Sequence, residues 1–105
     1  MAYNLVITDR AEELVDNSLL YLVKSLNNIQ AAQHYIDDIE AVYDRLRDNP
    51  YQFADSKDEY LASKGYKEAV FPEMNYKVIY RIDGDNVYVV GVYNDLENHS
   101  AKIII

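Results

Sequence analysis

The four residues Asp83-Gly84-Asp85-Asn86 constrain this 105-residue chain more than any other segment does. They separate two runs rich in β-branched and aromatic residues, 76–83 and 87–93. A two-residue Gly-Asp loop between such runs is typical of a β-hairpin. If Gly84-Asp85 form the tip, residues whose numbers sum to 169 face each other, and this register divides the hairpin into two chemically different faces.

The first of these faces is apolar or aromatic throughout, with Tyr76, Val78, Tyr80 and Ile82 on the earlier strand. We expect helices to cover it. The other face, called the distal face below, should be open and should expose Lys77 and Arg81. The expected pairs are Tyr80 with Val89, Val78 with Gly91 and Tyr76 with Tyr93 on the first face, and Arg81 with Tyr88, Ile79 with Val90 and Lys77 with Val92 on the distal face. Gly91, lacking a side chain, would let a helix approach closely.

Two helical patterns precede the sheet, over residues 9–26 and 29–48. Asp9 followed by Glu12 has the form of an N-cap with its N3 partner, although Thr8 can serve as the cap instead. Apolar residues then recur at helical spacing up to Asn27-Asn28. The second pattern ends before Pro50, since proline disfavours helix in the residue that precedes it. Helices joined by so short a connection must lie antiparallel.

The apolar residues of the second helix form one narrow stripe, spaced 3-4-3-4-3 along the chain. Its members are Ile29, Ala32, Ile36, Ile39, Tyr43 and Leu46. Such a stripe also suits a coiled coil. It spans fewer than three heptads and a sheet follows it, which favours packing within the same chain. His34, Asp37, Asp38 and Glu40 are expected at the surface of this helix.

Residues 3–8 and 66–71 predict two further strands, the second closed by Pro72. Residues 50–65 are polar and irregular. The predicted fold class is therefore α+β, with an N-terminal strand and an antiparallel helix hairpin packed on one face of a small antiparallel sheet. We expect one domain over residues 1–105, because a chain of this length cannot form two cores.

The charge and composition of the chain argue against nucleic-acid binding, membrane binding and metal chemistry. Ten Lys and Arg against eighteen Asp and Glu give a formal net charge of −8, so nucleic acid and anionic membranes repel the chain on average. There is no cysteine, and the acidic residues lack metal-binding spacing, so neither a metal site nor a cofactor is expected. No apolar run is long enough to span a membrane, and the sequence predicts a cytoplasmic protein.

Several segments in order resemble the RelE/ParE toxin superfamily of bacterial type II toxin–antitoxin systems. The opening run Val6-Ile7-Thr8-Asp9-Arg10-Ala11 is similar to the family's first strand and helix start. The most specific likeness is Lys64-Gly65-Tyr66-Lys67, then residues 76–83, then residues 87–93, which resemble the family's "GYR … Y-x-x-Y-x-I … V-x-V-x-x-V" core. The likeness covers nearly the whole chain.

The resemblance implies a growth-inhibiting toxin, of the kind that stabilises plasmids, held in a hetero-oligomer by a cognate antitoxin. ParE-like members bind DNA gyrase, and the longer helix hairpin and the Gly65-Tyr66-Lys67 entry look closer to that branch. RelE-like members are metal-independent endoribonucleases that cut mRNA in the ribosome. A third alternative is a degenerate, non-toxic homologue that keeps only partner binding.

The candidate site residues follow from the resemblance, which implies basic and aromatic residues on the open sheet face and in the C-terminal tail. For target binding they are Lys67, Lys77 and Arg81. RNA cleavage needs a base, an acid and a cation that stabilises the phosphorane. The candidates for those roles are Lys77, Arg81, Tyr93 and His99. Tyr93 is a candidate although the expected register places it on the helix-covered face, unless the strand ends twist.

The chain ends on Ile103-Ile104-Ile105, three side chains whose burial would each be worth ~1.5–3 kcal/mol. We expect residues 101–105 to dock, either on the edge of the chain's own sheet or as an edge that accepts an antitoxin segment.

Overall fold

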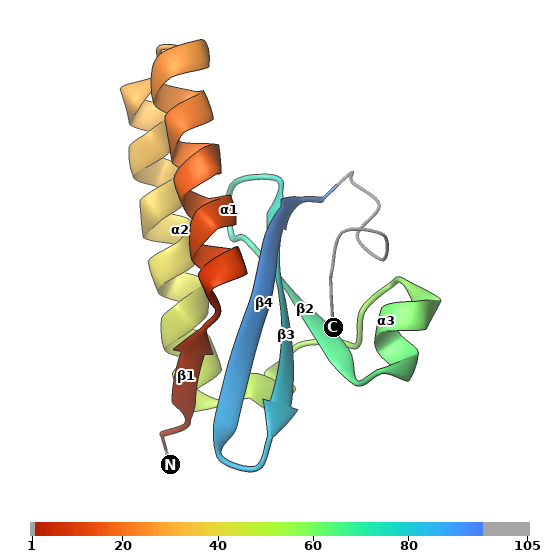
Figure 1. The fold of residues 1–105 in the computed structure, drawn as a ribbon. Coiled ribbons are helices and arrows are strands. Elements are labelled where there is room, and N and C mark those ends of the chain that lie inside the picture. The colour runs from red at the N-terminus through yellow and green to blue at the C-terminus, as the bar shows by residue number, and fades with distance from the viewer. Residues whose placement is uncertain (1, 96–105) are drawn as a thin grey trace.

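The computed structural model describes residues 2–95 of the chain. Its elements in order are β1 (Asn4–Ile7), α1 (Asp9–Leu20), η1 (Tyr21–Ser25), α2 (Ile29–Asp48), η2 (Pro50–Gln52), α3 (Glu59–Ser63), β2 (Tyr66–Val70), β3 (Tyr76–Asp83) and β4 (Asn86–Asn94). The long helix pair covers one side of the sheet, and the short α3 lies on the other (Figure 1). The predicted α+β class is confirmed. The predictions for His99 and for residues 101–105 lie outside the described residues.

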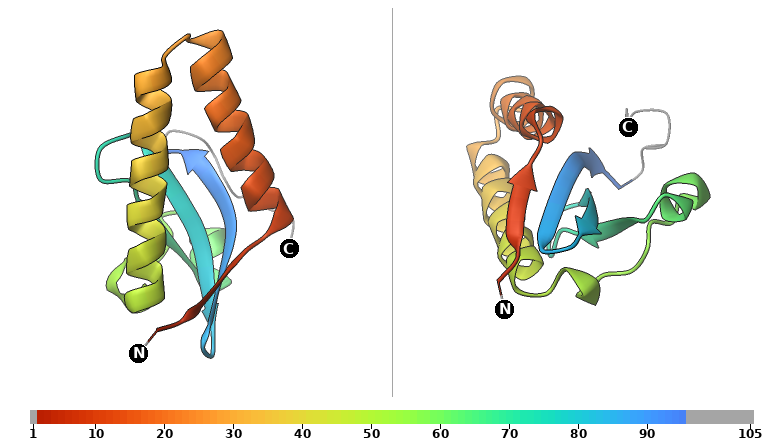
Figure 2. Two further views of the ribbon diagram at one scale, coloured as in Figure 1. Left: turned by 90° about the vertical axis from the view of Figure 1, so that its left-hand side faces the viewer. Right: turned by 60° about the horizontal axis from the view of Figure 1, so that its bottom comes forward.

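The helix pair matches its predicted limits. Of the two candidate caps of α1, Thr8 is the one used, and its hydroxyl oxygen accepts a hydrogen bond from the Ala11 amide at 3.2 Å. Beyond Leu20 the helix widens into the π-helical turn η1. Asn27 turns the chain with a φ of +49°, and Asn28 caps α2. The two helices run antiparallel, as Figure 2 shows from the side. Among residues 2–95 no helix is both long and apolar enough to cross a membrane.

The sheet has the strand order β1-β4-β3-β2. Its last three strands form the predicted antiparallel meander, with a two-residue Gly84-Asp85 tip in which Gly84 has a φ of +61°. β1 extends the meander into a mixed sheet, because it pairs with β4 in parallel. Parallel neighbours need a long crossover, and the helix pair lies within that connection.

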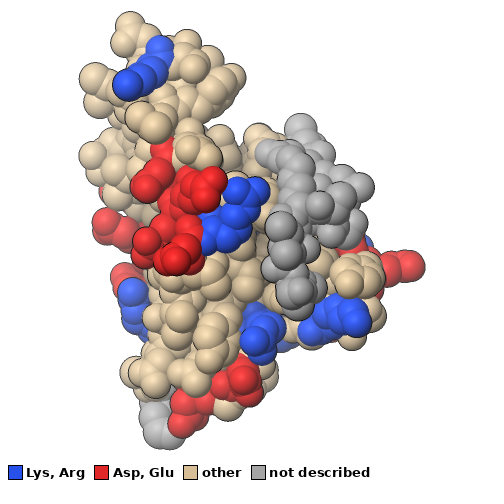
Figure 3. All heavy atoms as spheres, in the orientation of Figure 1, with Lys and Arg blue, Asp and Glu red and all other residues tan. Residues whose placement is uncertain are grey.

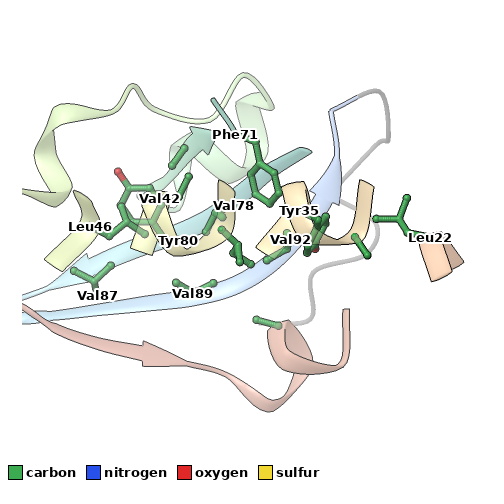
Figure 4. Packing of buried hydrophobic residues seen from close by; sticks show 14 residues of the cluster. Leu22, Tyr35, Val42, Leu46, Phe71, Val78, Tyr80, Val87, Val89 and Val92 are labelled. Atoms are coloured by element: carbon green, nitrogen blue, oxygen red, sulfur yellow. The ribbon is translucent and has the colours of Figure 1, made fainter. Parts of the chain in front are cut away.

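The main core lies between α2 and the helix-covered face of the sheet (Figure 4). Val78 and Tyr80 are fully buried there, while Tyr76 and Ile82 are partly buried against the same cluster, as predicted. The Tyr80 hydroxyl donates a hydrogen bond of 2.6 Å to the Pro50 carbonyl. Burial, and secondarily the charge of Asp55, raises the pKa of Tyr80 above its ordinary value, so this hydroxyl keeps its proton.

The predicted apolar stripes are right near the sheet and wrong at the far end of the hairpin. Ile29, Val23 and Leu26 are exposed, because the helices run on past the strands and have no sheet beneath them there. Asp38 was expected at the surface and is instead buried. Its carboxylate accepts backbone hydrogen bonds from Glu73 and Met74, which fixes the loop between β2 and β3.

The predicted hairpin register is correct near the tip and wrong beyond it. Arg81 faces Tyr88 and Tyr80 faces Val89 as expected, but a β-bulge follows. The observed pairs beyond the bulge are Ile79 with Gly91, Val78 with Val92, Lys77 with Tyr93 and Tyr76 with Asn94. One extra residue in β4 moves all later side chains to the other face of the strand.

Gly91 and Tyr93 therefore belong to the distal face, which corrects their predicted place under the helices. The missing side chain of Gly91 leaves space for the Tyr93 ring and not for a helix. A methyl group on Gly91 would lie 2.3 Å from Cε2 of the Tyr93 ring.

Candidate functional site

The distal face is not the open surface that strand alternation predicted, since a second small core closes its middle. Leu61 of α3 packs there with Tyr66, Ile79 and Tyr93, and all four are buried. Leu14 of α1 and Val90 flank this cluster. Helix α3 and the segment before it thus act as a lid over the part of the sheet where β2 and β3 meet.

Lys77 lies at this closed end and is buried, with 5% of its surface exposed. The prediction that Lys77 is an exposed cation is therefore wrong. Its Nζ lies 3.2 Å from Oε1 of Glu68 and 3.3 Å from Oδ1 of Asp95. A buried ammonium ion is tolerated only when it is paired, and here two carboxylates pair with it.

Glu68 is the residue that sequence reasoning missed at this position. It is 6% exposed, and its second oxygen accepts hydrogen bonds from the Ser56 hydroxyl at 2.5 Å and from the Lys57 amide at 3.1 Å. One signal was available. Glu68 alternates with Tyr66 and Val70 along β2, so the strand places it on the distal face beside Lys77.

Arg81 lies at the opposite end of the distal face, where the sheet is only partly covered. The strand pairings align Val6, Tyr88, Arg81 and Tyr66 in one row across all four strands. The Arg81 guanidinium carbon lies 4.8 Å from the centre of the Tyr88 ring, a cation–π contact. No carboxylate of residues 2–95 lies within ion-pair distance of Arg81. We call these four residues the Arg81 row.

Lys67 is not brought together with Lys77 and Arg81. It pairs with Tyr80 across β2 and β3, which places it on the helix-covered side of the sheet. Its Nζ donates to the Phe53 carbonyl at 3.2 Å and lies 3.1 Å from Asp55. The three proposed target-binding cations therefore occupy three different environments.

Tyr93 does meet Lys77, although the expected register had separated them. The bulge places the two residues directly opposite each other on β3 and β4, on the same face as Arg81. His99, the fourth catalytic candidate, lies outside the described residues. Within the described part of the chain no three His, Asp or Glu side chains converge as metal ligands would.

The distal face therefore has two chemically different parts. The Arg81 row offers a partly exposed cation between aromatic rings, which suits a partner that brings a carboxylate, a phosphate or an aromatic ring. The Lys77 cluster, made of Lys77, Glu68 and Asp95, holds one positive and two negative formal charges, with Lys77 and Glu68 buried and Asp95 partly exposed. Acidic side chains dominate the part of the helix pair nearer β1, as the space-filling view shows (Figure 3).

Comparison with known proteins places this geometry among bacterial toxins. The family model described as "ParE toxin of type II toxin-antitoxin system, parDE" matches residues 5–98. No curated protein matches the sequence significantly.

Three solved structures of the same fold are a toxin–antitoxin system, a toxin–antitoxin complex and a free toxin. The chromosomal ParDE system of P. aeruginosa matches with a TM-score of 0.71 and 17% identity, over 89% of this chain and 96% of that one. The RelBE2 toxin–antitoxin complex of Mycobacterium tuberculosis matches with a TM-score of 0.59 and 15% identity, over 90% and 99% of the two chains. A mutant of the E. coli toxin RelE in the free state gives a TM-score of 0.51 and 14% identity, over 97% and 88%.

Proposed function

This chain belongs to the ParE toxin family of type II toxin–antitoxin systems, and from that premise we propose that it inhibits growth by binding a protein target, DNA gyrase. It acts in the cytoplasm as a single domain of residues 1–105, is neutralised in a hetero-oligomer by a cognate antitoxin, and stabilises the replicon that encodes it. The choice of target rests on one observation. The ammonium group of Lys77 is buried and paired with Glu68 and Asp95.

That arrangement opposes the chemistry of RNA cleavage. In the transition state the phosphorane carries extra negative charge, and an enzyme without a metal needs an exposed cation to stabilise it. The formal charges of the Lys77 cluster are +1, −1 and −1, which sum to −1. An RNA backbone approaching this end of the distal face would meet net negative charge.

Target binding has a better candidate in the Arg81 row. Arginine and tyrosine are the residues most often found at the energetic centre of protein interfaces. Arg81 stacks on Tyr88, is partly exposed, and has no carboxylate partner among residues 2–95. It can therefore pair with a carboxylate of the target without first breaking an ion pair of its own.

A ribosome-dependent endoribonuclease of the RelE type remains the second candidate, and one observation favours it. Lys77, Arg81 and Tyr93 share the distal face, with Tyr93 directly across from Lys77. If binding to the ribosome displaced Asp95 from Lys77, a cation and a proton-transferring phenol would lie side by side. This candidate needs a rearrangement, whereas gyrase binding does not.

The deciding experiment compares both activities with one pair of variants. Purified protein is added to a DNA supercoiling assay with gyrase and, separately, to a translation system whose mRNA is mapped for cuts. We expect inhibition of supercoiling, which Arg81→Ala abolishes, and intact mRNA.

Arg45→Ala is the matched control, since Arg45 also lies 4.8 Å from the centre of an aromatic ring, that of Phe53, but on another surface. Arg45→Ala should inhibit gyrase as the unmodified chain does. Site-specific mRNA cuts that disappear in Lys77→Ala would establish the endoribonuclease instead. Absence of both activities, with antitoxin binding retained, would identify a degenerate homologue.

A further inference from the structure

The helix hairpin ends in an exposed apolar surface on the side away from the Gly84-Asp85 turn of the sheet. Five of its large apolar side chains are between 39% and 71% exposed; they are Leu20, Tyr21, Val23, Leu26 and Ile29. Isolated apolar residues on a surface are ordinary, but a contiguous group of this kind marks an interaction site. We call these five residues the hairpin end.

The hairpin end also differs from the rest of the chain in charge. None of the eighteen Asp and Glu residues falls between positions 17 and 36, and the charged residue in that stretch is Lys24. In Figure 3 the far end of the hairpin shows no acidic surface, whereas acidic side chains crowd the helices nearer β1. A second acidic protein can approach this surface without the repulsion that the remaining surface imposes.

Helix α1 continues this surface into a groove. An open depression of about 450 Å³ is lined by Asp16, Leu19, Leu20 and Val23. Asp16 and Leu20 lie one turn apart on the same face of α1, and Lys24 lies about one turn beyond Leu20 in the wider π-helical turn η1. The surface thus carries an anion before Leu20 and a cation after it, and two helical turns, roughly 10 Å of rise, keep Asp16 and Lys24 of one chain too far apart to pair.

We propose that this surface binds a second copy of the same chain, with the two α1 helices antiparallel about a twofold axis that passes near Leu20. In such a pair, residues equally far from the axis lie opposite each other. Since Asp16 and Lys24 lie about one helical turn on either side of Leu20, Asp16 lies beside the partner's Lys24, and the partner's Asp16 lies beside Lys24. The surface is thus complementary to itself, which a twofold interface requires.

The same geometry covers the exposed hairpin end. Leu26 follows the π-helical turn, about one and a half turns beyond Leu20, so it reaches the level of Val15 on the other copy. A further depression of about 220 Å³ lies there, lined by Ile7, Glu12, Val15, Asp16, Ile39 and Tyr43. Each hairpin end would therefore enter an apolar groove of its partner, and two Asp16–Lys24 ion pairs would flank the axis.

The first test measures the mass of the full chain in solution by sedimentation at increasing concentration. We expect a dimer that dissociates on dilution. Leu20→Glu removes an apolar contact from both copies and places two carboxylates at the axis, and it should weaken dimerisation about a hundredfold. Tyr60→Glu is the matched control, because Tyr60 and Leu20 are both 52% exposed, and this variant should dimerise normally.

The second test exchanges charges. Lys24→Asp and Asp16→Lys should each weaken the dimer, and the double variant should restore it, because the two residues meet only between copies. Circular dichroism confirms that each variant is folded. A monomer at every concentration, or a dimer indifferent to Leu20→Glu, overturns the proposal. A monomer whose Leu20→Glu variant loses antitoxin or gyrase binding overturns it too and assigns the groove to that partner. The gyrase assay with Arg81→Ala does not depend on either result.

Discussion

The two faces of the sheet are made by the same strands and are stabilised in different ways. On the helix-covered face β3 contributes Val78 and Tyr80 to a core of aliphatic and aromatic side chains that holds no charged group. On the distal face the same strand contributes Lys77, which is buried and paired with two carboxylates, and Arg81, which is partly exposed. Alternation along a strand thus predicts which residues share a face, but not what covers that face. The coverage decides whether a cation is a binding group or a structural one.

The helix-covered face should show the largest effect on stability. Tyr80→Ala removes a fully buried ring and the hydrogen bond to Pro50, and we expect it to lower the free energy of unfolding by ~3–5 kcal/mol. Denaturant unfolding measures this change. Tyr88→Ala is the control from the partly exposed Arg81 row, and it should cost less than half as much. Equal losses would mean that the two faces do not differ as described.

Much of the fold was predictable from local patterns. Both helices, the two-residue hairpin tip and the limits of β3 follow from apolar spacing, caps and turn residues near in sequence. The bulge in β4 was not predictable, because Val89-Val90 has the same pattern as any other strand segment. The cluster of Ile79 and Tyr93 against which Val90 packs is assembled only by the tertiary fold. The exposed hairpin end was missed for a similar reason, since periodicity does not tell how far the sheet extends beneath a helix.

On the distal face the decisive variant is Lys77→Met. It leaves Glu68 buried without its ammonium partner, and breaking a buried ion pair from one side typically costs ~3–5 kcal/mol. Because Glu68 keeps its hydrogen bonds from the Ser56 hydroxyl and the Lys57 amide, we expect a loss at the lower end of that range, ~3 kcal/mol. Thermal and denaturant unfolding measure the loss.

The double variant Glu68→Leu with Lys77→Met tests the cause of that loss. If uncompensated charge is responsible, removing both partners should recover most of the stability, because well-packed apolar residues often replace a buried pair at little cost. A double variant less stable than Lys77→Met alone would show that Ser56 and Lys57 depend on the Glu68 carboxylate more than Lys77 does.

The site was less predictable than the fold, and the reason is physical. Lys77, Glu68 and Asp95 come from three separate segments, and Ser56 from a loop without sequence periodicity. The buried ion pair of Lys77 and Glu68 forms only because the fold brings those segments together. The pairing of Arg81 with Tyr88 was predicted correctly because it lies in the part of the register between the turn and the bulge.

Gly91→Ala probes the bulge that brings the distal face together. The added methyl group would lie 2.3 Å from the Tyr93 ring, so the ring must move, and overpacking of this kind costs ~1–3 kcal/mol. Tyr93→Ala with Gly91→Ala should remove the clash, and the cost of the glycine substitution should then fall to that of an ordinary strand position. A cost that persists in the Tyr93→Ala background would mean that Gly91 serves the backbone of the bulge and not the ring.

Arg81→Lys should change stability least and function most. The side chain is partly exposed and makes no ion pair within residues 2–95, so its contact with Tyr88 contributes at most ~1 kcal/mol. Lysine keeps the positive charge but loses the planar guanidinium that stacks on an aromatic ring and grips a carboxylate with two hydrogen bonds. We therefore expect an unfolding midpoint close to that of the unmodified chain and a gyrase inhibition weakened about tenfold, which corresponds to ~1.4 kcal/mol. Full inhibition by Arg81→Lys would mean that charge alone attracts the target, and full inhibition by Arg81→Ala as well would remove the Arg81 row from the binding surface.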